Sequence, residues 1–396
     1  MTRIYLDHAA TTPILPEVKA AMEPWLGAGF GNPSSLHEEG RRARAAIDEA
    51  RETVSAYLGC LFAEVIFTSS GTEAANLAIV GAALANTDRS RNRVLLGATE
   101  HHCVLHTQPV LERMGYRVEL IPVDRIARVR LDGLEAMMGS DVLLVSVMSA
   151  NNELGTIQPV AEVADLAHRH GALFHCDAVQ TLAILDFGFR ILDFGCDLAS
   201  FSAHKIYGPK GVGALYVKAG TKVKPLTVGG GQERELRAGT ENVAGIVGFG
   251  AALGLREALR ASGADSEIRG PTEPHFSRDA FLDRLVEAGF KPSVPNRADT
   301  LPGHAHVRLP GVDAETMLIR LDRMGVSASS GAACSSGSLE PSHVLLACGY
   351  SPREASEGLR FTFGRTSAIE EAEEASARVV EAGMRLTSSQ GSAHPG

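Results

Sequence analysis

The chain has 396 residues, of which 44% are hydrophobic and 21% charged, the composition of an ordinary water-soluble globular protein. Its length exceeds what one hydrophobic core usually supports, so two domains are expected. The net charge of -9 and the pI near 5.9 argue against a nucleic-acid partner held by phosphate neutralisation, and the apolar runs are far too short to span a membrane.

The N-terminal residues and the cysteines indicate the compartment. Residues 1–7 (MTRIYLD) contain no apolar segment typical of a secretory signal, so a cytoplasmic location is expected. The six cysteines include no C-x-x-C pair, which argues against a disulfide framework and against a zinc ribbon. Five of them lie in or beside apolar stretches and are expected in the core: Cys60, Cys103, Cys176, Cys196 and Cys348.

The first elements in the chain are a short strand and a long helix. Residues 5–13 begin as a strand and continue into a polar turn that ends at Pro13. After a glycine-rich loop at 27–33, a charged helix is expected to run to about Leu58. Ser34 or Ser35 is the expected N-cap of this helix, because a serine oxygen can accept from the first free amides.

The chain then alternates between strands and helices. Strands are expected at 64–68, 93–97, 116–123, 142–148, 172–176, 198–201 and 214–217. Helices are expected at 73–85, 104–114, 131–138 and 160–170, the last closed by Gly171. Such alternation predicts an α/β fold in which a mostly parallel sheet is covered by helices on both faces. Ligands bind such sheets outside the carboxyl ends of the strands.

The composition changes after Gly254. Residues 260–277 are rich in Gly, Pro and Ser and are expected to form a surface connection. A helix at 281–288, a strand at 306–309 and a helix at 314–324 then predict a smaller α+β domain. The expected division is an N-terminal segment at 1–14 that packs with the small domain, a large domain at 15–255, the small domain at 256–385 and a disordered tail at 386–396.

A polar loop between the last two strands of the large domain carries Lys205. Ser202 and His204 precede this lysine, and Gly208, Pro209 and Gly211 follow and restrict the loop. A lysine held at a strand end can form a Schiff base with a carbonyl cofactor. A solvated loop lysine is the alternative interpretation.

Other strand ends carry groups that a phosphorylated pyridine cofactor requires. Residues 69–72 (SSGT) precede a helix, so their amides and hydroxyls could bind an anion, with Ser202 and His204 as further donors. Asp177 could keep a ring nitrogen protonated, and His101 could lie on the ring. Taken alone, a Ser-Gly-Thr before a helix is more often a simple cap, and a single Asp at a strand end is more often a turn residue.

Two cysteine-containing segments have distinct chemistry. Residues 99–103 (TEHHC) suggest a zinc site, but neighbouring side chains on an extended loop point to opposite sides and no partner pair follows at the usual spacing, so no metal is expected. Residues 327–338 (SASSGAACSSGS) place Cys334 among small residues, which is typical of a reactive rather than a packed thiol.

Together these motifs resemble the cysteine desulfurases of the NifS/IscS type. The resemblance follows the chain order from residue 5 to about 366 and rests on YLDHAATTP at 5–13, FGNPSS at 30–35, TEH at 99–101, NNELG at 151–155, DAVQ at 177–180, SAHKIYGPKG at 202–211, RAGTE at 237–241, and ACSS at 333–336 with LEPS at 339–342. It implies a pyridoxal 5'-phosphate (PLP) enzyme of fold type I in the class V aminotransferase group. That fold has a seven-stranded, mainly parallel sheet, a small domain made from both chain ends, and an obligate homodimer. Residues 185–195 look longer than in relatives, and a surface bulge is expected there.

The resemblance implies a role for each matching residue. Lys205 would form the Schiff base, Asp177 would pair with the pyridinium nitrogen, Gln180 would bond the phenolic oxygen, and His101 would stack on the ring and move protons. Gly71, Thr72, Ser202 and His204 would hold the phosphate, with Thr240 reaching in from the other subunit. Asn152 would lie beside the cofactor and, with Arg360, bind the substrate carboxylate, since an arginine fork matches a carboxylate.

The implied reaction converts L-cysteine to L-alanine and leaves the sulfur as a persulfide on Cys334, for delivery to a sulfur acceptor such as an iron–sulfur scaffold. Three different functions stay open: a class V aminotransferase, a selenocysteine lyase, and a catalytically silent PLP-binding scaffold of an assembly complex. An aminotransferase would need a keto acid and would have no use for Cys334. The retained Lys205, Asp177 and Cys334 argue against a silent scaffold.

Overall fold

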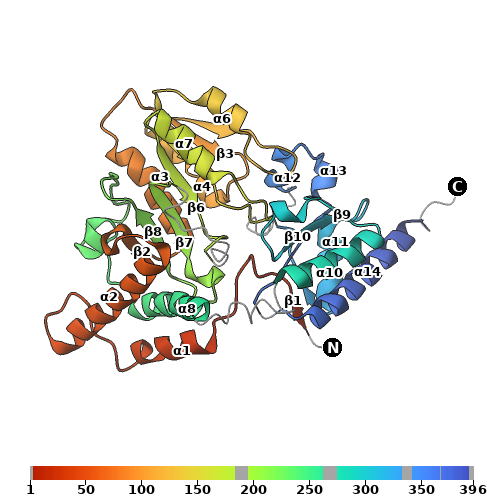
Figure 1. Ribbon diagram of the computed structural model, residues 1–396, viewed down its shortest axis with the longest axis horizontal. Coiled ribbons are helices and arrows are strands. Elements are labelled where there is room, and N and C mark those ends of the chain that lie inside the picture. The colour runs from red at the N-terminus through yellow and green to blue at the C-terminus, as the bar shows by residue number, and fades with distance from the viewer. Residues whose placement is uncertain (1–2, 183–194, 262–273, 332–340, 366, 392–396) are drawn as a thin grey trace.

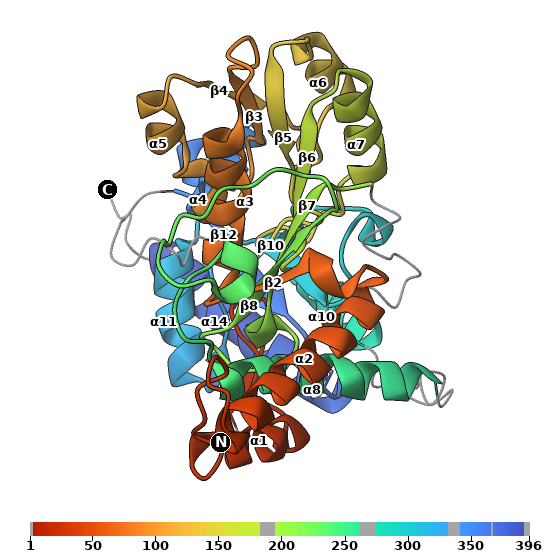
Figure 2. The same cartoon turned by 90° about the vertical axis from the view of Figure 1, so that its left-hand side faces the viewer.

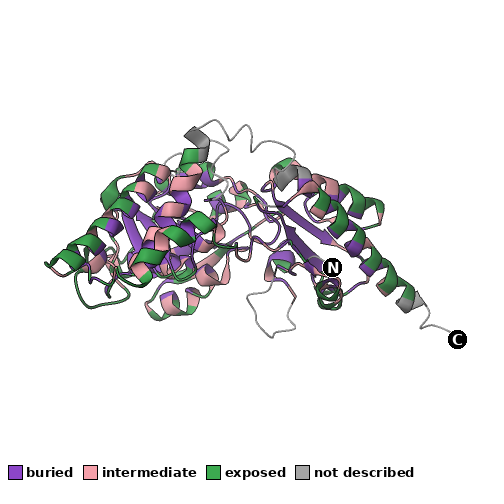
Figure 3. Ribbon diagram, turned by 90° about the horizontal axis from the view of Figure 1, so that it is seen from below, coloured by how far each residue is buried: buried purple, intermediate pink, exposed green. Residues whose placement is uncertain are grey.

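The computed structural model describes residues 3–182, 195–261, 274–331, 341–365 and 367–391. The chain forms two lobes, each with buried strands at its centre and exposed helix faces outside (Figures 1 and 3). The larger lobe contains a seven-stranded sheet in the order β2-β8-β7-β6-β5-β3-β4. Its strands are β2 (Val65–Thr68), β3 (Arg93–Gly97), β4 (Arg117–Ile121), β5 (Val142–Ser146), β6 (Leu173–Asp177), β7 (Leu198–Ser202) and β8 (Gly213–Val217).

The sheet is mainly parallel, as the sequence predicts. Strands β4, β3, β5, β6 and β7 pair in parallel, whereas β8 runs antiparallel between β7 and β2. The β7–β8 hairpin encloses the loop that carries Lys205, and β6 lies directly beside β7. The carboxyl ends of four neighbouring parallel strands therefore meet at one edge.

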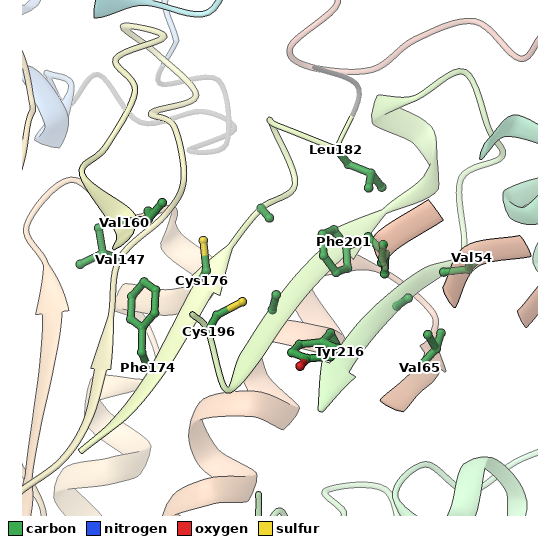
Figure 4. Packing of buried hydrophobic residues seen from close by; sticks show 14 of the residues in the cluster. Val54, Val65, Val147, Val160, Phe174, Cys176, Leu182, Cys196, Phe201 and Tyr216 are labelled. Atoms are coloured by element: carbon green, nitrogen blue, oxygen red, sulfur yellow. The ribbon is translucent and has the colours of Figure 1, made fainter. Parts of the chain in front are cut away.

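Helices cover both faces of this sheet (Figure 2). One face packs against α3 (Gly71–Ala85), α4 (His102–Leu105) and α5 (Gln108–Arg113), which contribute Leu77, Val104 and Leu111 to one apolar cluster. The other face packs against α2 (Glu38–Leu58), α6 (Leu131–Met137), α7 (Val160–Arg169) and α8 (Val243–Ala261). Phe174 and Phe201, on adjacent strands, both belong to this second cluster (Figure 4). The central strands are buried on both faces and therefore appear in the sequence as continuous apolar runs.

The smaller lobe is built around a three-stranded antiparallel sheet in the order β12-β10-β9. These strands are β9 (Lys291–Pro292), β10 (His304–Arg308) and β12 (Gly358–Thr362). They pack with α10 (Pro274–Glu287), α11 (Ala314–Arg323) and α14 (Ile369–Gly391) around a core that includes Phe281 and Phe361. Two short helices, α12 (His343–Ala347) and α13 (Pro352–Ala355), lie before β12.

The N-terminal strand belongs to the smaller lobe. Strand β1 (Ile4–Tyr5) pairs in parallel with β11 (Val326–Ser327), and Ile4 and Leu6 join the core of that lobe. After Leu6 the chain passes to the larger lobe and enters α1 (Pro16–Met22), which packs on α8. Short 3-10 turns complete the described elements: η1 (Glu23–Leu26), η2 (Phe62–Glu64), η5 (Ala203–Lys205), η6 (Gln232–Glu235) and η7 (Arg297–Asp299).

Several local expectations were wrong. Helix α2 is capped by His37, whose ring accepts the Gly40 amide at 3.3 Å, and not by Ser34 or Ser35, which lie before the first turn. The helix expected at 104–114 is two short helices, because His106 and Thr107 interrupt it. Of the five cysteines expected in the core, Cys60 and Cys103 are only partly buried.

The expectations for the polar segments also need correction. Helix α8 extends to Ala261 and α10 begins at Pro274, so helices occupy both ends of the expected connection at 260–277. Helix α14 continues to Gly391, so the tail does not begin at 386. The bulge expected at 185–195 lies outside the described residues except for Gly195. Within the described residues, no helix is both long and apolar enough to cross a membrane.

Candidate active site

The site residues follow the carboxyl ends of β3, β5, β6 and β7. His101 lies just beyond β3, and Asn152 follows β5. Asp177 is the last residue of β6, and its Cα pairs in register with Ser200 of β7. Because these four strands are neighbours in the sheet, their ends bring together residues that are up to about a hundred positions apart in the chain.

Lys205 ends the 3-10 turn η5, which begins where β7 stops. Its Nζ donates to the backbone carbonyls of Ala9 and Ala10, the latter at 2.9 Å. Gln180 Nε2 donates to the same Ala9 carbonyl at 3.2 Å. The amine predicted to be chemically active is therefore partly buried and held beside Gln180, and it is not a freely solvated surface lysine.

The N-terminal segment is joined to the lysine loop by several hydrogen bonds. The Thr12 amide and hydroxyl both donate to the His204 carbonyl at 2.9 Å, and the Tyr207 amide donates to the Thr12 hydroxyl at 2.7 Å. Tyr207 has a φ of 66°, a conformation that is strained for a bulky residue. The segment thus stabilises an irregular turn around Lys205, a function that the sequence did not reveal.

Asp177 is a buried carboxylate with 7% exposure. Its Oδ1 accepts the Val179 amide at 3.0 Å, and its Oδ2 lies 4.0 Å from Cys103 Sγ. Burial raises the pKa of Asp177 to about 6, although the Val179 hydrogen bond and the Lys205 charge oppose the shift. A carboxylate in such a position favours a cationic partner, such as a protonated ring nitrogen.

His101 caps the short helix α4. Its Nδ1 accepts the Cys103 amide at 3.1 Å, so the neutral ring carries its proton on Nε2. Burial and the nearby Lys205 charge lower the pKa of His101 to about 4. The ring is therefore neutral at physiological pH. No group of three or more histidine, cysteine or acidic side chains among the described residues is arranged to hold a metal.

The preceding residue, Glu100, is a buried acid that sequence reasoning missed. It is 1% exposed, its Oε1 accepts the Met148 amide at 2.5 Å, and its Oε2 has no hydrogen-bond partner. Burial, followed by the Asp177 charge, raises the pKa of Glu100 well above its ordinary value. Burial and the neighbouring Asp177 charge thus both favour the protonated form of Glu100. Its place within TEH at 99–101 was the only indication in the sequence.

The first turn of α3 forms a candidate phosphate cradle. Ser70 caps the helix by accepting the Glu73 amide at 3.1 Å, and the amides of Gly71 and Thr72 have no partner within the helix. A Cβ on Gly71 would lie 2.8 Å from a Val179 methyl carbon and 3.4 Å from Ser202 Cβ. Only glycine therefore fits where α3 approaches the ends of β6 and β7.

His204 supplies a neutral ring near the same strand ends. Its Nδ1 lies 3.1 Å from the Thr11 hydroxyl. Burial, with the charges of Lys205 and Lys210, lowers the pKa of His204 to about 4. A neutral imidazole can donate one hydrogen bond to a phosphate without adding a charge.

Arg360 lies on β12 of the smaller lobe and points to the junction between the lobes. One terminal nitrogen donates to the Asn152 carbonyl and the other to Asp7 Oδ1, each at 2.8 Å. The side chain is buried, and its Nε has no hydrogen-bond partner. A buried guanidinium with an unused donor is suited to bind a carboxylate. The pairing with Asp7 was not anticipated from the sequence.

Three other residues predicted for the site are exposed or lie outside the described residues. Thr240 is exposed on the loop after η6, and Arg237 of this loop pairs with Glu73 Oε1 at 2.9 Å. Thr72 is also exposed. Cys334 lies outside the described residues, between Gly331 and Pro341.

Known proteins resemble this chain over nearly its whole length. Residues 4–374 match the family described as Aminotransferase class-V. A protein of Dictyoglomus turgidum named "Cysteine desulfurase IscS" is 45% identical over 91% of this chain and 89% of its own length. A protein of Bacillus subtilis named "Putative cysteine desulfurase IscS 1" is 42% identical over 98% of this chain and 100% of its own length.

Solved structures show the same similarity in three dimensions. One described as a NifS-like protein superposes with a TM-score of 0.87 at 34% identity and covers 96% of this chain and 99% of its own. Another, described as SspA in complex with cysteine, has a TM-score of 0.77 at 32% identity and covers 91% of this chain and 99% of its own. The lobes and strand order described above are therefore those of a known group of enzymes.

Proposed function

This chain belongs to the aminotransferase class-V family, and we propose that it works as a PLP-dependent cysteine desulfurase that converts L-cysteine to L-alanine and transfers the sulfur to Cys334. The observation that carries the proposal is the pairing of a partly buried Lys205 with a buried Asp177 at the ends of the neighbouring strands β7 and β6, together with a buried arginine, Arg360, that has an unused donor. The structural neighbour in complex with cysteine supports the choice of substrate.

The strand-end residues fit a pyridine aldehyde phosphate. The close approach at Gly71 leaves room for backbone but not for a side chain, and the α3 amides offer positive partial charge to a phosphate. Asp177 offers a buried negative charge to a ring nitrogen, and Lys205 offers an amine to an aldehyde. We propose that the cofactor is held by Gly71, Thr72, His101, Asn152, Asp177, Gln180, Ser202, His204 and Lys205, with Thr240 of a second copy.

When bound, PLP supplies an electron sink for the charge that develops at the substrate Cα. Arg360 would bind the substrate carboxylate through its unpaired Nε and through the two terminal nitrogens, which donate to Asp7 and to the Asn152 carbonyl in this structure. This orients Cα toward Lys205, whose amine would take the Cα proton once it is neutral. His101 is neutral with its proton on Nε2, so it donates a hydrogen bond at the start of a cycle and does not begin as a cation.

The sulfur transfer itself requires the thiolate of Cys334. The thiolate attacks the substrate sulfur, so that an S–S bond forms and the Cβ–S bond breaks. The electron pair of the broken bond and a proton complete the methyl group of alanine. The products are then alanine and a Cys334 persulfide, which a reductant or an acceptor protein removes.

The decisive experiment measures alanine and persulfide after L-cysteine is added to the purified protein without any keto acid. We expect one alanine and one persulfide per subunit in a first turnover, and we expect the Cys334→Ser variant to bind cysteine but to form neither product. Cys60→Ser, which changes a partly buried thiol outside the site, is the matched control. Alanine formation only with a keto acid would identify an aminotransferase instead.

Two further results would identify a different function. Selenide release from selenocysteine with no reaction of cysteine would identify a selenocysteine lyase, and binding of PLP without any turnover would identify a silent scaffold. We further propose a homodimer, because the exposed Thr240 would complete the site of the partner, and an iron–sulfur scaffold as a sulfur acceptor. A cytoplasmic location stays a prediction from the sequence.

A further inference from the structure

Glu153 is a buried carboxyl group that the proposed reaction does not use. It follows Asn152 in the loop after β5 and is 2% exposed. Its Oε2 accepts a hydrogen bond of 2.5 Å from the Ser342 hydroxyl. Burial raises the pKa of Glu153 to about 7, although the Ser342 hydrogen bond and the Arg360 charge oppose the shift. Burying a carboxyl group costs free energy, so a buried group such as this one is expected to serve a structural or functional purpose.

Ser342 lies just after the Cys334-bearing part of the chain. The Ser342 side chain is 4% exposed, and its oxygen also accepts the Leu345 amide at 3.2 Å, which caps α12. One hydroxyl thus binds the helix that follows and the carboxyl group of Glu153. The chain is therefore held in place at Ser342, just after the part that carries Cys334.

Gly331 lies just before the same part of the chain, and the Glu153 side chain occupies the space that a Cβ on this residue would need. A Cβ on Gly331 would lie 2.9 Å from Glu153 Cγ and 3.1 Å from its Oε2, and the glycine has a φ of 84°. The Gly331 amide donates to the Ser329 hydroxyl at 3.1 Å. Ser329 in turn exchanges backbone hydrogen bonds with Arg360 at 2.6 and 3.2 Å. Only glycine fits this position beside the carboxyl group.

The two flanks of the Cys334-bearing part of the chain therefore meet at one carboxyl group next to the substrate residues. Arg360 donates to the carbonyl of Asn152, the residue that precedes Glu153, and its backbone pairs with Ser329. We infer that Glu153 is a positioning residue for sulfur transfer: it bonds Ser342 and fills the space beside Gly331, so that the chain between them starts and ends beside the substrate carboxylate site. This inference rests on the proposed role of Cys334 in the reaction.

The first variant is Ser342→Ala, which removes one bond to Glu153 and leaves Arg360 unchanged. We expect unchanged PLP content and an unchanged absorbance change on L-cysteine binding, while single-turnover persulfide formation on Cys334 falls about tenfold, since the hydrogen bond that holds the flank at Ser342 is lost. In the cofactor-free protein, proteolytic cleavage between residues 331 and 342, followed by mass spectrometry, should accelerate several-fold because the flank is released.

Ser351→Ala is the matched control, because Ser351 caps α13 in the same way but does not contact Glu153. It should change neither persulfide formation nor cleavage between residues 331 and 342. Glu153→Gln keeps an oxygen that can accept the Ser342 hydroxyl and should retain most of the transfer rate, whereas Glu153→Ala should not. This pair also tests the inference if Ser342→Ala does not fold.

Three outcomes would overturn the inference: a normal transfer rate in folded Ser342→Ala, a loss of equal size in cofactor binding and transfer, or equal losses in the glutamine and alanine variants of Glu153. Failure of the proposed function is distinguishable, because in that case the wild-type protein itself would form no persulfide on Cys334.

Discussion

The two halves of the site differ in the distance along the chain between the residues that hold them. In the strand-end half (Gly71, His101, Asp177 and Lys205), Asp177 and His101 are each oriented by an amide two positions later. In the junction half (Asp7, Asn152, Glu153 and Arg360), the Arg360 pairs with Asp7 and Asn152 join residues 353 and 208 positions apart.

This difference separates the chemistry from the binding of substrate. Local turns at strand ends orient Asp177 and His101, so these two groups keep their geometry whenever the large sheet is folded, whereas Lys205 also depends on the distant carbonyls of Ala9 and Ala10. The junction half forms only when both lobes are in place. Substitutions in the first half are therefore expected to change chemistry or local stability, and those in the second to change substrate affinity and sulfur transfer.

The largest effect is expected for Lys205→Ala. Without the amine that moves the Cα proton, alanine formation should fall by about 10²–10⁴-fold or more. The midpoint of urea unfolding should change little, since η5 stays anchored through Thr12 and His204. Steady-state alanine assays and urea titrations measure both effects, with Lys210→Ala, an exposed neighbour, as control. Near-normal turnover in the Lys205 variant would remove Lys205 from the mechanism.

The next effect concerns the stability of the cofactor-free protein. The folded pKa of Asp177, about 6, is above that of an unfolded aspartate, so the folded state binds more protons and its stability decreases as pH rises from about 4 to 6. Asp177→Asn avoids the buried charge and should be more stable above pH 7 by up to about 3 kcal/mol. It should also lose desulfurase activity.

Urea unfolding of both cofactor-free proteins at pH 5 and pH 8 measures this difference. The gain from Asp177→Asn should be smaller at pH 5, where the wild-type carboxyl group is already mostly protonated. A variant that is less stable than wild type at pH 8 would contradict the argument.

In the junction half, Arg360→Lys should weaken substrate binding. A lysine keeps the charge but cannot provide the planar fork, so about 1.5–3 kcal/mol of binding to the carboxylate is expected to be lost. The KM for L-cysteine should rise about 10- to 150-fold with a smaller change in kcat. Arg308→Lys, on neighbouring β10, is the control, because Arg308 pairs with Glu354 and Glu357 away from the site. A change in kcat alone would place Arg360 in the chemistry instead.

The smallest effect is expected at the N-terminus of α3, the helix that starts at Gly71. Ser70→Ala removes the N-cap of α3 and should lower the free energy of unfolding by about 1 kcal/mol. Ser34→Ala should change it by much less, because Ser34 caps no helix and α2 is capped by His37. Thermal unfolding of both variants compares the two serines. Equal decreases in stability would show that the Ser70 cap does not stabilise α3.

The sequence alone determined the parts of the molecule that depend on local patterns. The apolar runs of the central strands and the glycines and polar residues that follow them predict the parallel sheet and place Asp177 and Lys205 at strand ends. These predictions hold because burial on both faces requires continuous apolar strands and because turns depend on nearby residues.

Only the tertiary structure decided the contacts between distant parts of the chain. The cap of α2, the pairing of Asp7 with Arg360 and the meeting of Gly331 and Ser342 at Glu153 leave no periodic pattern in the sequence. Each depends on which backbone atoms the folded lobes bring within hydrogen-bond distance. Polar groups buried at such meeting points must find partners there, and the partners are fixed by the packing of two separate cores and not by residues nearby in the chain.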